Sequence, residues 1–124
     1  MPKLLIVDDE TIIRENLSIY LEDEGFEPFE ASTAEDALIK MRFETFDCII
    51  VDLRLPGKDG VEFINQAFEL YRFNRFIIHT GSAEFRMPKS FFEMGMSAEN
   101  ILQKPVQDMS VFKDKIESLL KAFQ

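Results

Sequence analysis

The sequence predicts an α/β fold in which a doubly wound, five-stranded parallel sheet is covered by helices on both faces. Continuous apolar runs such as LLIV (4–7), CIIV (48–51) and FIIH (76–79) are typical of parallel strands buried on both faces. Between the runs lie segments whose apolar residues recur at helical spacing, so strands and helices alternate along the chain. A chain of 124 residues suits one core, and we expect a single domain over residues 1–124.

The first strand, LLIV, is followed by a predicted helix of about four turns. Gly25 supplies a stop signal for this helix. The segment 26–32 then predicts a short strand, and Pro28 favours a position near the edge of the sheet because proline cannot donate a ladder hydrogen bond. The apolar positions of the helix are Ile12, Ile13, Leu17, Tyr20 and Leu21.

The second and third helices flank the strand CIIV. STAEDALIKMRF (32–43) predicts a helix whose first turn has Ser32 and Glu35 at capping-box spacing. After the strand, a loop rich in proline and glycine (53–60) leads into a third helical pattern over residues 61–73.

The last part of the chain completes the alternation. The strand RFIIHTGS (75–82) precedes a short helix, which Pro88 fits in its first turn and Gly95 ends. ENILQKP (99–105) predicts the fifth strand, and residues 108–123 predict an amphipathic final helix.

Composition excludes several classes of protein. The chain has 14 basic and 23 acidic residues, a net charge of −9, so we expect no direct binding to nucleic acid. The single cysteine, Cys48, lies in an apolar run and suits a buried thiol in a reducing compartment. No segment has the pattern of a signal peptide or the roughly 20 apolar residues of a membrane span. We therefore expect a soluble cytoplasmic protein that does not associate with membranes.

Polar side chains end four of the predicted strands. In doubly wound sheets ligands bind outside the carboxyl ends of the strands. Asp8 and Asp9 end the first strand and Asp52 the third, while Thr80 ends the fourth and Lys104 the fifth. These three carboxylates and one ammonium sum to a charge of −2. Oxygen ligands that repel one another suit Mg²⁺, which would neutralise them.

Each of these residues alone also fits a structural role, as a turn former, a cap or a solvated lysine. It is their combination that favours a site. A zinc site is disfavoured because the sole histidine, His79, lies within an apolar strand and is expected to belong to the core.

The motifs IVDDE, CIIVDLRLPGKDG, IIHTGS and ILQKP resemble those of receiver domains of bacterial two-component response regulators, the CheY-like superfamily. The resemblance covers the whole chain and implies a flavodoxin-like (βα)5 fold with strand order 2-1-3-4-5. It also implies that an aspartate accepts a phosphoryl group from a histidine kinase or a histidine phosphotransfer protein and that the domain then acts on a downstream protein or effector domain. No effector domain is expected in this chain. Two copies would pair through the face formed by the fourth helix, fifth strand and fifth helix.

The resemblance assigns the candidate site residue by residue. Asp52 matches the phosphoacceptor and Asp8 and Asp9 the acidic pair. Asp9 is then the more direct Mg²⁺ ligand, Asp8 acts largely through water, and Asp52 and the backbone carbonyl of Arg54 supply further oxygens.

Two more residues of the site follow from the resemblance. Thr80 matches the hydroxyl that turns toward the phosphoryl group, and Lys104 matches the lysine that pairs with it. The resemblance also implies a cis peptide bond between Lys104 and Pro105.

One position departs from the family pattern. Three residues before the lysine, receiver domains usually have Tyr or Phe, and here the residue is Ile101. We therefore expect a switch without an aromatic ring flip, through the loop after Thr80 and the short helix near Pro88. The expected movable surface consists of Phe85, Phe91, Phe92 and Met94, with burial against the sheet as the alternative.

Two other functions remain open at this point. A magnesium-dependent phosphatase that forms an aspartyl phosphate usually needs a second aspartate two residues after the nucleophile, where this chain has Arg54. A receiver-like module that binds a partner constitutively would not need all five site residues. We therefore expect a signalling receiver, not an enzyme, with at most weak self-phosphorylation and autodephosphorylation.

Overall fold

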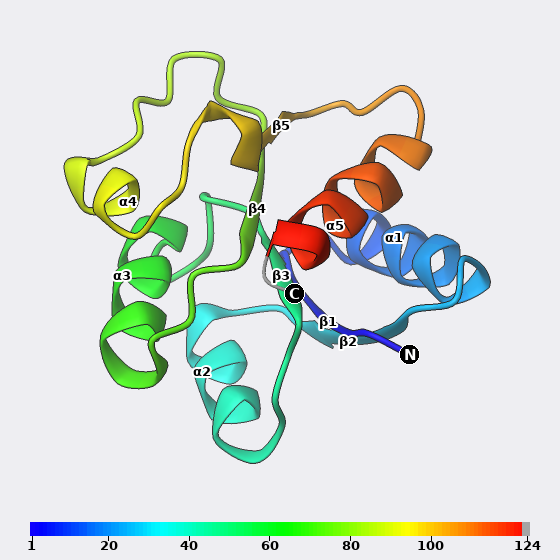
Figure 1. The fold of residues 1–124 in the computed structure, drawn as a ribbon, viewed down its shortest axis with the longest axis horizontal. Coiled ribbons are helices and arrows are strands. Elements are labelled where there is room, and N and C mark those ends of the chain that lie inside the picture. Colours follow the sequence, from blue (N-terminus) through cyan, green and yellow to red (C-terminus); the bar gives the residue numbers. More distant parts are fainter. Residues whose placement is uncertain (123–124) are drawn as a thin grey trace.

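Five parallel strands form one sheet in the order β2-β1-β3-β4-β5 in the computed structural model, which describes residues 1–122 (Figure 1). This confirms the predicted doubly wound sheet and the order implied by the family resemblance. The strands are β1 (Lys3–Val7), β2 (Glu27–Ala31), β3 (Cys48–Val51), β4 (Phe76–Thr80) and β5 (Ile101–Gln103).

Helices cover both faces of the sheet. α1 and α5 lie on one face, and α2, α3 and α4 lie on the other (Figure 1). The helices are α1 (Thr11–Asp23), α2 (Ala34–Phe43), α3 (Gly60–Tyr71), α4 (Lys89–Glu93) and α5 (Ser110–Ala122), with a short 3-10 helix, η1 (Ala98–Asn100), before β5. The final helix was predicted to reach residue 123, which lies outside the described residues.

The continuous apolar runs are explained by two separate cores. In β1, Leu4 and Ile6 pack in the core under α1 and α5, whereas Leu5 and Val7 pack in the core under α2, α3 and α4. Every second residue of a strand faces the same side, so a strand between two helical layers needs apolar residues at every position. The prediction that Cys48 is a core thiol is confirmed, because it is fully buried and burial raises its pKa to about 12.

The start of α2 differs from the prediction. Thr33, not Ser32, is the N-cap, and its hydroxyl accepts a hydrogen bond from the backbone N–H of Asp36 at 3.0 Å. A helix that begins after Thr33 buries Ala34 and Ala37 against the sheet, and this packing selects between the two adjacent hydroxyl residues.

The segment between β4 and β5 also differs in detail. Pro88 precedes α4 as its N-cap instead of lying in its first turn, while Gly95, at φ +95°, follows the helix as predicted. Residues 99 and 100, expected in the fifth strand, belong to η1. Asn100 holds them there, because its side chain accepts from the N–H of Ser97 at 2.9 Å and donates to the carbonyl of Phe76 at 2.8 Å.

Three apolar residues lie elsewhere than expected. Ile12 belongs to the apolar pattern of α1 but is 74 % exposed. Phe91 and Met94 were predicted on a movable surface with burial against the sheet as the alternative, and the alternative holds, because both are buried in the core under α2, α3 and α4. Their exposed neighbour Phe92 and the partly buried Phe85 are the members of that group outside the core.

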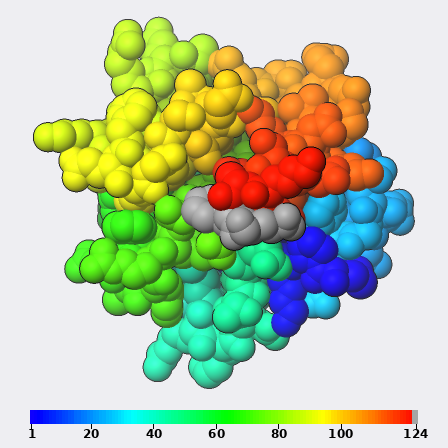
Figure 2. All heavy atoms as spheres, in the orientation of Figure 1, coloured from blue at the N-terminus to red at the C-terminus, as the bar shows by residue number. Residues whose placement is uncertain are grey.

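The N-terminal residues lie beside the last helix. Figure 2 shows the first residues of the chain and the C-terminal helix on the same face of the molecule. A shallow cavity there is lined by Pro2, Phe26 and the α5 residues Lys113 and Leu120, among others. Within residues 1–122, no helix is long and apolar enough to cross a membrane.

Candidate functional site

Parallel pairing brings two of the predicted carboxylates to the same edge of the sheet. Val7 of β1 pairs with Val51 of β3, so Asp8 and Asp52 follow at the same level. The backbone N–H of Asp52 donates to the carbonyl of Val7 at 2.9 Å, and that of Asp8 donates to the carbonyl of Ala31 at 3.1 Å. The hydrogen bonds of the sheet thus continue one residue beyond the strands and fix both aspartates.

Asp8, Asp9 and Asp52 form one cluster. Their nearest carboxylate oxygens lie within 4.8 Å of one another, and no other group of three possible metal-ligating side chains this close occurs in the part of the chain that the structure describes. Asp8 and Asp52 are buried, with 3 % and 4 % of their surface exposed, whereas Asp9 is exposed. Two buried carboxylates at such a separation repel each other strongly unless positive charge lies between them.

Lys104 supplies that charge. Its Nζ donates to Oδ2 of Asp8 at 3.0 Å and to Oδ2 of Asp52 at 3.1 Å. Burial acts to lower the pKa of Lys104, but the hydrogen bonds and charges of Asp8 and Asp52 outweigh it, and the pKa lies above its usual value. The ammonium group is therefore charged at neutral pH.

The backbone around Lys104 holds the side chain in place. Its N–H donates to the carbonyl of Thr80 at 2.8 Å, which joins the ends of β4 and β5. The peptide bond between Lys104 and Pro105 is cis, as predicted.

Backbone groups and one arginine bind the remaining oxygens of the two aspartates. Oδ1 of Asp8 accepts from the N–H of Glu10 at 2.9 Å, and Oδ1 of Asp52 accepts from the N–H of Arg54 at 3.2 Å. Nη1 of Arg14 donates to the backbone carbonyl of Asp8 at 2.7 Å, and its Nε binds Glu30 at 3.0 Å. Arg14 could not be identified from the sequence, because an arginine near the start of a helix carries no signal that distinguishes it from a solvated one.

Thr80 lies next to the cluster but is turned toward the loop that follows it. Its side chain is 1 % exposed, and its hydroxyl accepts a hydrogen bond from the N–H of Ser82 at 3.1 Å. The cavity at the site, about 320 Å³, is lined by Asp9, Glu10, Asp52, Arg54, Gly81 and Lys104. Asp8 and Thr80 are absent from this lining. Asp8 still contacts Lys104, whereas the Thr80 hydroxyl is engaged with the loop.

A glycine allows the loop after Asp52 to pack against the strand end. A Cβ on Gly60 would lie 2.6 Å from the backbone oxygen of Asp52 and from Cα of Leu53, closer than real contacts allow. The N–H of Gly60 donates to the carbonyl of Leu53 at 2.9 Å. Any larger residue would push α3 away from Asp52.

His79 lies on the face of the sheet that α1 and α5 cover, as expected of a core residue. It is 5 % exposed, and its ring packs edge-on against Phe112 with 4.9 Å between ring centroids. Burial, and then the charge of Lys104, lowers its pKa to about 4, with Asp52 acting in the opposite direction. The imidazole is therefore neutral at neutral pH.

The donor set of the cluster fits a hard divalent cation. It offers carboxylate oxygens and no nitrogen or sulfur, which suits Mg²⁺ and not zinc. Both oxygens of Asp8 already accept hydrogen bonds, whereas no described group donates one to the exposed carboxylate of Asp9. Asp9 is thus the carboxylate most open to direct coordination.

Sequence comparison with known proteins points to one family. The family model described as the response regulator receiver domain matches residues 4–117. The transcriptional regulatory protein SrrA of Staphylococcus aureus is 34 % identical over 122 residues, which are 98 % of this chain and 49 % of SrrA. The chain therefore spans about half the length of this relative.

Solved structures agree in fold. A CheY-like receiver domain protein from Methanospirillum hungatei has a TM-score of 0.83 at 32 % identity, covering 98 % of this chain and 95 % of that one. The response regulator TrrA of Thermotoga maritima, in complex with Mg²⁺ and BeF, has a TM-score of 0.82 at 28 % identity, covering 97 % and 100 %. With the fold, the acidic cluster and the match over residues 4–117 taken together, the chain belongs to the family of response regulator receiver domains.

Proposed function

We propose that Asp52 accepts a phosphoryl group from a histidine kinase or a histidine phosphotransfer protein, and that the phosphorylated domain alters its contacts with a downstream protein or effector domain. The main support for the proposal is the position of Lys104. Its Nζ lies 3.0 Å from Oδ2 of Asp8 and 3.1 Å from Oδ2 of Asp52. This arrangement places a cation against the buried carboxylate of Asp52, as an aspartate nucleophile requires.

The reaction transfers one phosphoryl group between two proteins. A carboxylate oxygen of Asp52 forms a bond to phosphorus as the bond from phosphorus to the donor imidazole nitrogen breaks, and that nitrogen keeps the electron pair. Phosphoryl transfer depends mainly on positioning and charge stabilisation, because its transition state is loose. Lys104 fits the charge-stabilising role, since its Nζ already touches Asp52 and can follow the oxygens of the incoming group.

Asp8, Asp9, Asp52 and the backbone carbonyl of Arg54 would hold a Mg²⁺ ion. When bound, Mg²⁺ supplies positive charge that offsets both the carboxylates and the phosphoryl oxygens. The complex of TrrA with Mg²⁺ and BeF supports this choice of ion for a domain of the same fold. Asp9 would take the directly coordinating role, because no described group donates a hydrogen bond to its carboxylate, and Asp8 would take the outer one, with both of its oxygens bound by Glu10 and Lys104.

Thr80 connects the phosphoryl site to the rest of the molecule. Its hydroxyl now accepts from the N–H of Ser82 at 3.1 Å. A turn of that hydroxyl toward a phosphoryl oxygen on Asp52 breaks this bond and frees the loop that leads to α4. In β5, Ile101 pairs with Ile78 and has no ring that could follow the threonine, so the loop transmits the change.

The proposal is tested by incubation with acetyl phosphate and Mg²⁺ followed by intact-mass measurement. We expect the wild-type chain to gain one phosphoryl group and Asp52→Asn to gain none. Asp59→Asn is the matched control, because Asp59 is an exposed N-cap of α3 outside the cluster and asparagine also caps helices well. Equal labelling of Asp52→Asn and Asp59→Asn would refute the assignment.

A further inference from the structure

A second cavity lies between α1 and α5 and shares one lining residue, Lys104, with the cavity at the acidic cluster. It has a volume of about 220 Å³ and is lined mainly by apolar side chains. Among them are Ile13 and Leu17 of α1, Val106 and Met109 of the segment after β5, and Phe112 of α5. Asp52, where the proposed phosphoryl transfer takes place, does not line this cavity.

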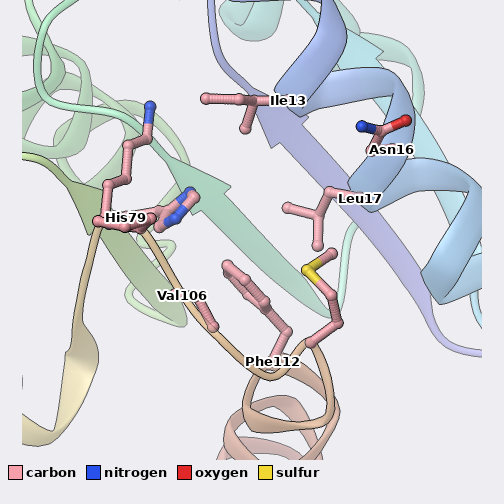
Figure 3. Close-up of a pocket in the computed structure, with 9 residues that line it drawn as sticks. Ile13, Asn16, Leu17, His79, Val106 and Phe112 are labelled. Atoms are coloured by element: carbon pink, nitrogen blue, oxygen red, sulfur yellow. The ribbon is translucent and has the colours of Figure 1, made fainter.

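His79 places one polar group at the cavity. Its imidazole points from β4 into the space bounded by Ile13, Leu17 and Phe112 (Figure 3). The residue is 5 % exposed, and its Nε2 is the one buried side-chain nitrogen or oxygen that lacks a hydrogen-bond partner in the described chain. Buried polar groups almost always have partners, so an unpaired one beside a cavity indicates a missing partner.

The surroundings define what that partner can be. An anionic ligand is disfavoured, because the imidazole is neutral and the ammonium of Lys104 is already bound by Asp8 and Asp52. A hydroxyl group both donates and accepts, so it matches a neutral imidazole nitrogen in either tautomer.

The volume limits the size of the ligand. An apolar protein cavity of about 150 Å³ holds benzene, and this cavity of about 220 Å³ leaves room for one ring with a small substituent. Pockets for drug-sized molecules begin at about 300 Å³.

We propose that this cavity is a binding site for a neutral, single-ring aromatic molecule whose hydroxyl group hydrogen-bonds with Nε2 of His79. The ring packs among the side chains of α1 and α5, and the hydroxyl completes the hydrogen bonding of the histidine. The two cavities share Lys104, but ligand binding here is measured in the unphosphorylated chain, so its outcome is distinguishable from that of the proposed function.

Phenol and toluene provide a matched pair of probes, because they have nearly the same shape and differ in the hydroxyl. His79 is the sole histidine of the chain, so its imidazole ¹⁵N signals are unambiguous in a titration followed by NMR. We expect phenol to shift the Nε2 signal with saturation and to bind about fivefold more tightly than toluene, which corresponds to one net hydrogen bond. In His79→Leu, the preference for phenol should disappear.

A second pair of variants tests the location even if His79→Leu fails to fold. Ile13→Phe fills part of the cavity and should weaken phenol binding at least tenfold, as read from backbone amide shifts. Ile12→Phe makes the same change at the adjacent position, which is 74 % exposed and does not line the cavity, and should leave binding unchanged. Three results would overturn the site: equal affinity for phenol and toluene, equal effects of the two phenylalanine variants, or an Nε2 paired with an ordered water molecule in a chain that does not bind phenol.

Discussion

At the scale of single residues, one ammonium group balances two buried carboxylates. Lys104 contacts both Asp8 and Asp52, and its side chain is 14 % exposed. Removal of one partner of a buried ion pair is costly because the remaining charge is left without compensation. The acidic cluster therefore depends on Lys104 or on a bound cation.

Lys104→Met should lower the free energy of unfolding by about 3 kcal/mol in the presence of chelator. Mg²⁺ should then stabilise the variant more than it stabilises the wild type, because the ion replaces the lost positive charge. Urea unfolding with and without Mg²⁺ measures both effects. Lys115→Met is the control, since Lys115 pairs with the exposed Glu99 at 3.0 Å and such surface pairs contribute at most about 1 kcal/mol. Equal losses in the two variants would contradict the role given to Lys104.

His79 should make stability depend on pH. Its pKa is lowered from 6.5 to about 4 in the folded state, first by burial and then by Lys104. As the pH falls below 6.5, the unfolded chain binds a proton that the folded chain does not, so this contribution to stability is full above pH 6.5 and is lost as the pH falls toward 4. The loss amounts to at most about 3 kcal/mol.

The contribution of His79 is separated from that of the carboxylates by comparison with His79→Leu. Urea unfolding at several pH values between 6.5 and 4 should show a shallower loss of stability in the variant. Parallel curves for the two proteins would mean that His79 titrates alike in the folded and unfolded chain.

At the scale of secondary-structure elements, caps and loops decide where helices begin and what can move. α2 begins after Thr33, whose hydroxyl accepts from Asp36 at 3.0 Å, and the adjacent Ser32 is exposed. The segment between β4 and α4, residues 81–88, contains no helix or strand. At the start of this segment, the backbone N–H of Ser82 donates a hydrogen bond to the Thr80 hydroxyl.

Thr33→Ala should destabilise the domain by about 1 kcal/mol, because it removes the side-chain oxygen that binds the first turn of α2. Ser32→Ala changes a neighbouring hydroxyl that does not cap the helix and should change stability by less than about 0.5 kcal/mol. Thermal or urea unfolding of the two variants compares them directly. A larger loss of stability in Ser32→Ala than in Thr33→Ala would instead identify Ser32 as the cap.

Beryllofluoride with Mg²⁺, a mimic of the phosphoryl group, should alter amide exchange over residues 81–92 and leave α2 unchanged. The reason is that Thr80 must release Ser82 to reach the mimic, while Ile101 stays packed against the core and paired with Ile78. Hydrogen exchange followed by mass spectrometry resolves these segments. Changes confined to the immediate site would instead favour a plain phosphoryl carrier.

At the scale of the whole molecule, the parts predicted well are those that depend on patterns repeated along the chain. The runs LLIV, CIIV and FIIH identified buried parallel strands, since helices on both faces require apolar residues at every position. The positions of Asp8 and Asp52 followed from the ends of two of those strands, that of Lys104 from the end of the fifth strand, and the strand order from the family resemblance.

The features that the sequence did not reveal depend on three-dimensional packing. The cap at Thr33, the contact of Arg14 with Asp8, the η1 turn held by Asn100 and the burial of Phe91 each result from contacts between segments. At the α2 cap, for example, the local pattern offers both Ser32 and Thr33, and the packing of Ala34 and Ala37 selects Thr33. The cavity beside His79 was likewise not visible, because residues from α1, β4 and α5 form it together.

The role of Asp52 as phosphoacceptor is measured most directly by chemical mapping of the modified residue. The chain is incubated with acetyl phosphate and Mg²⁺, reduced with borohydride, which converts an aspartyl phosphate to homoserine, and then digested and sequenced by mass spectrometry. We predict homoserine at position 52 alone, and none when chelator replaces Mg²⁺, because the three carboxylates otherwise repel the donor. Homoserine at position 8 or 9, or unmodified Asp52 in a chain that has gained phosphate elsewhere, would contradict the account.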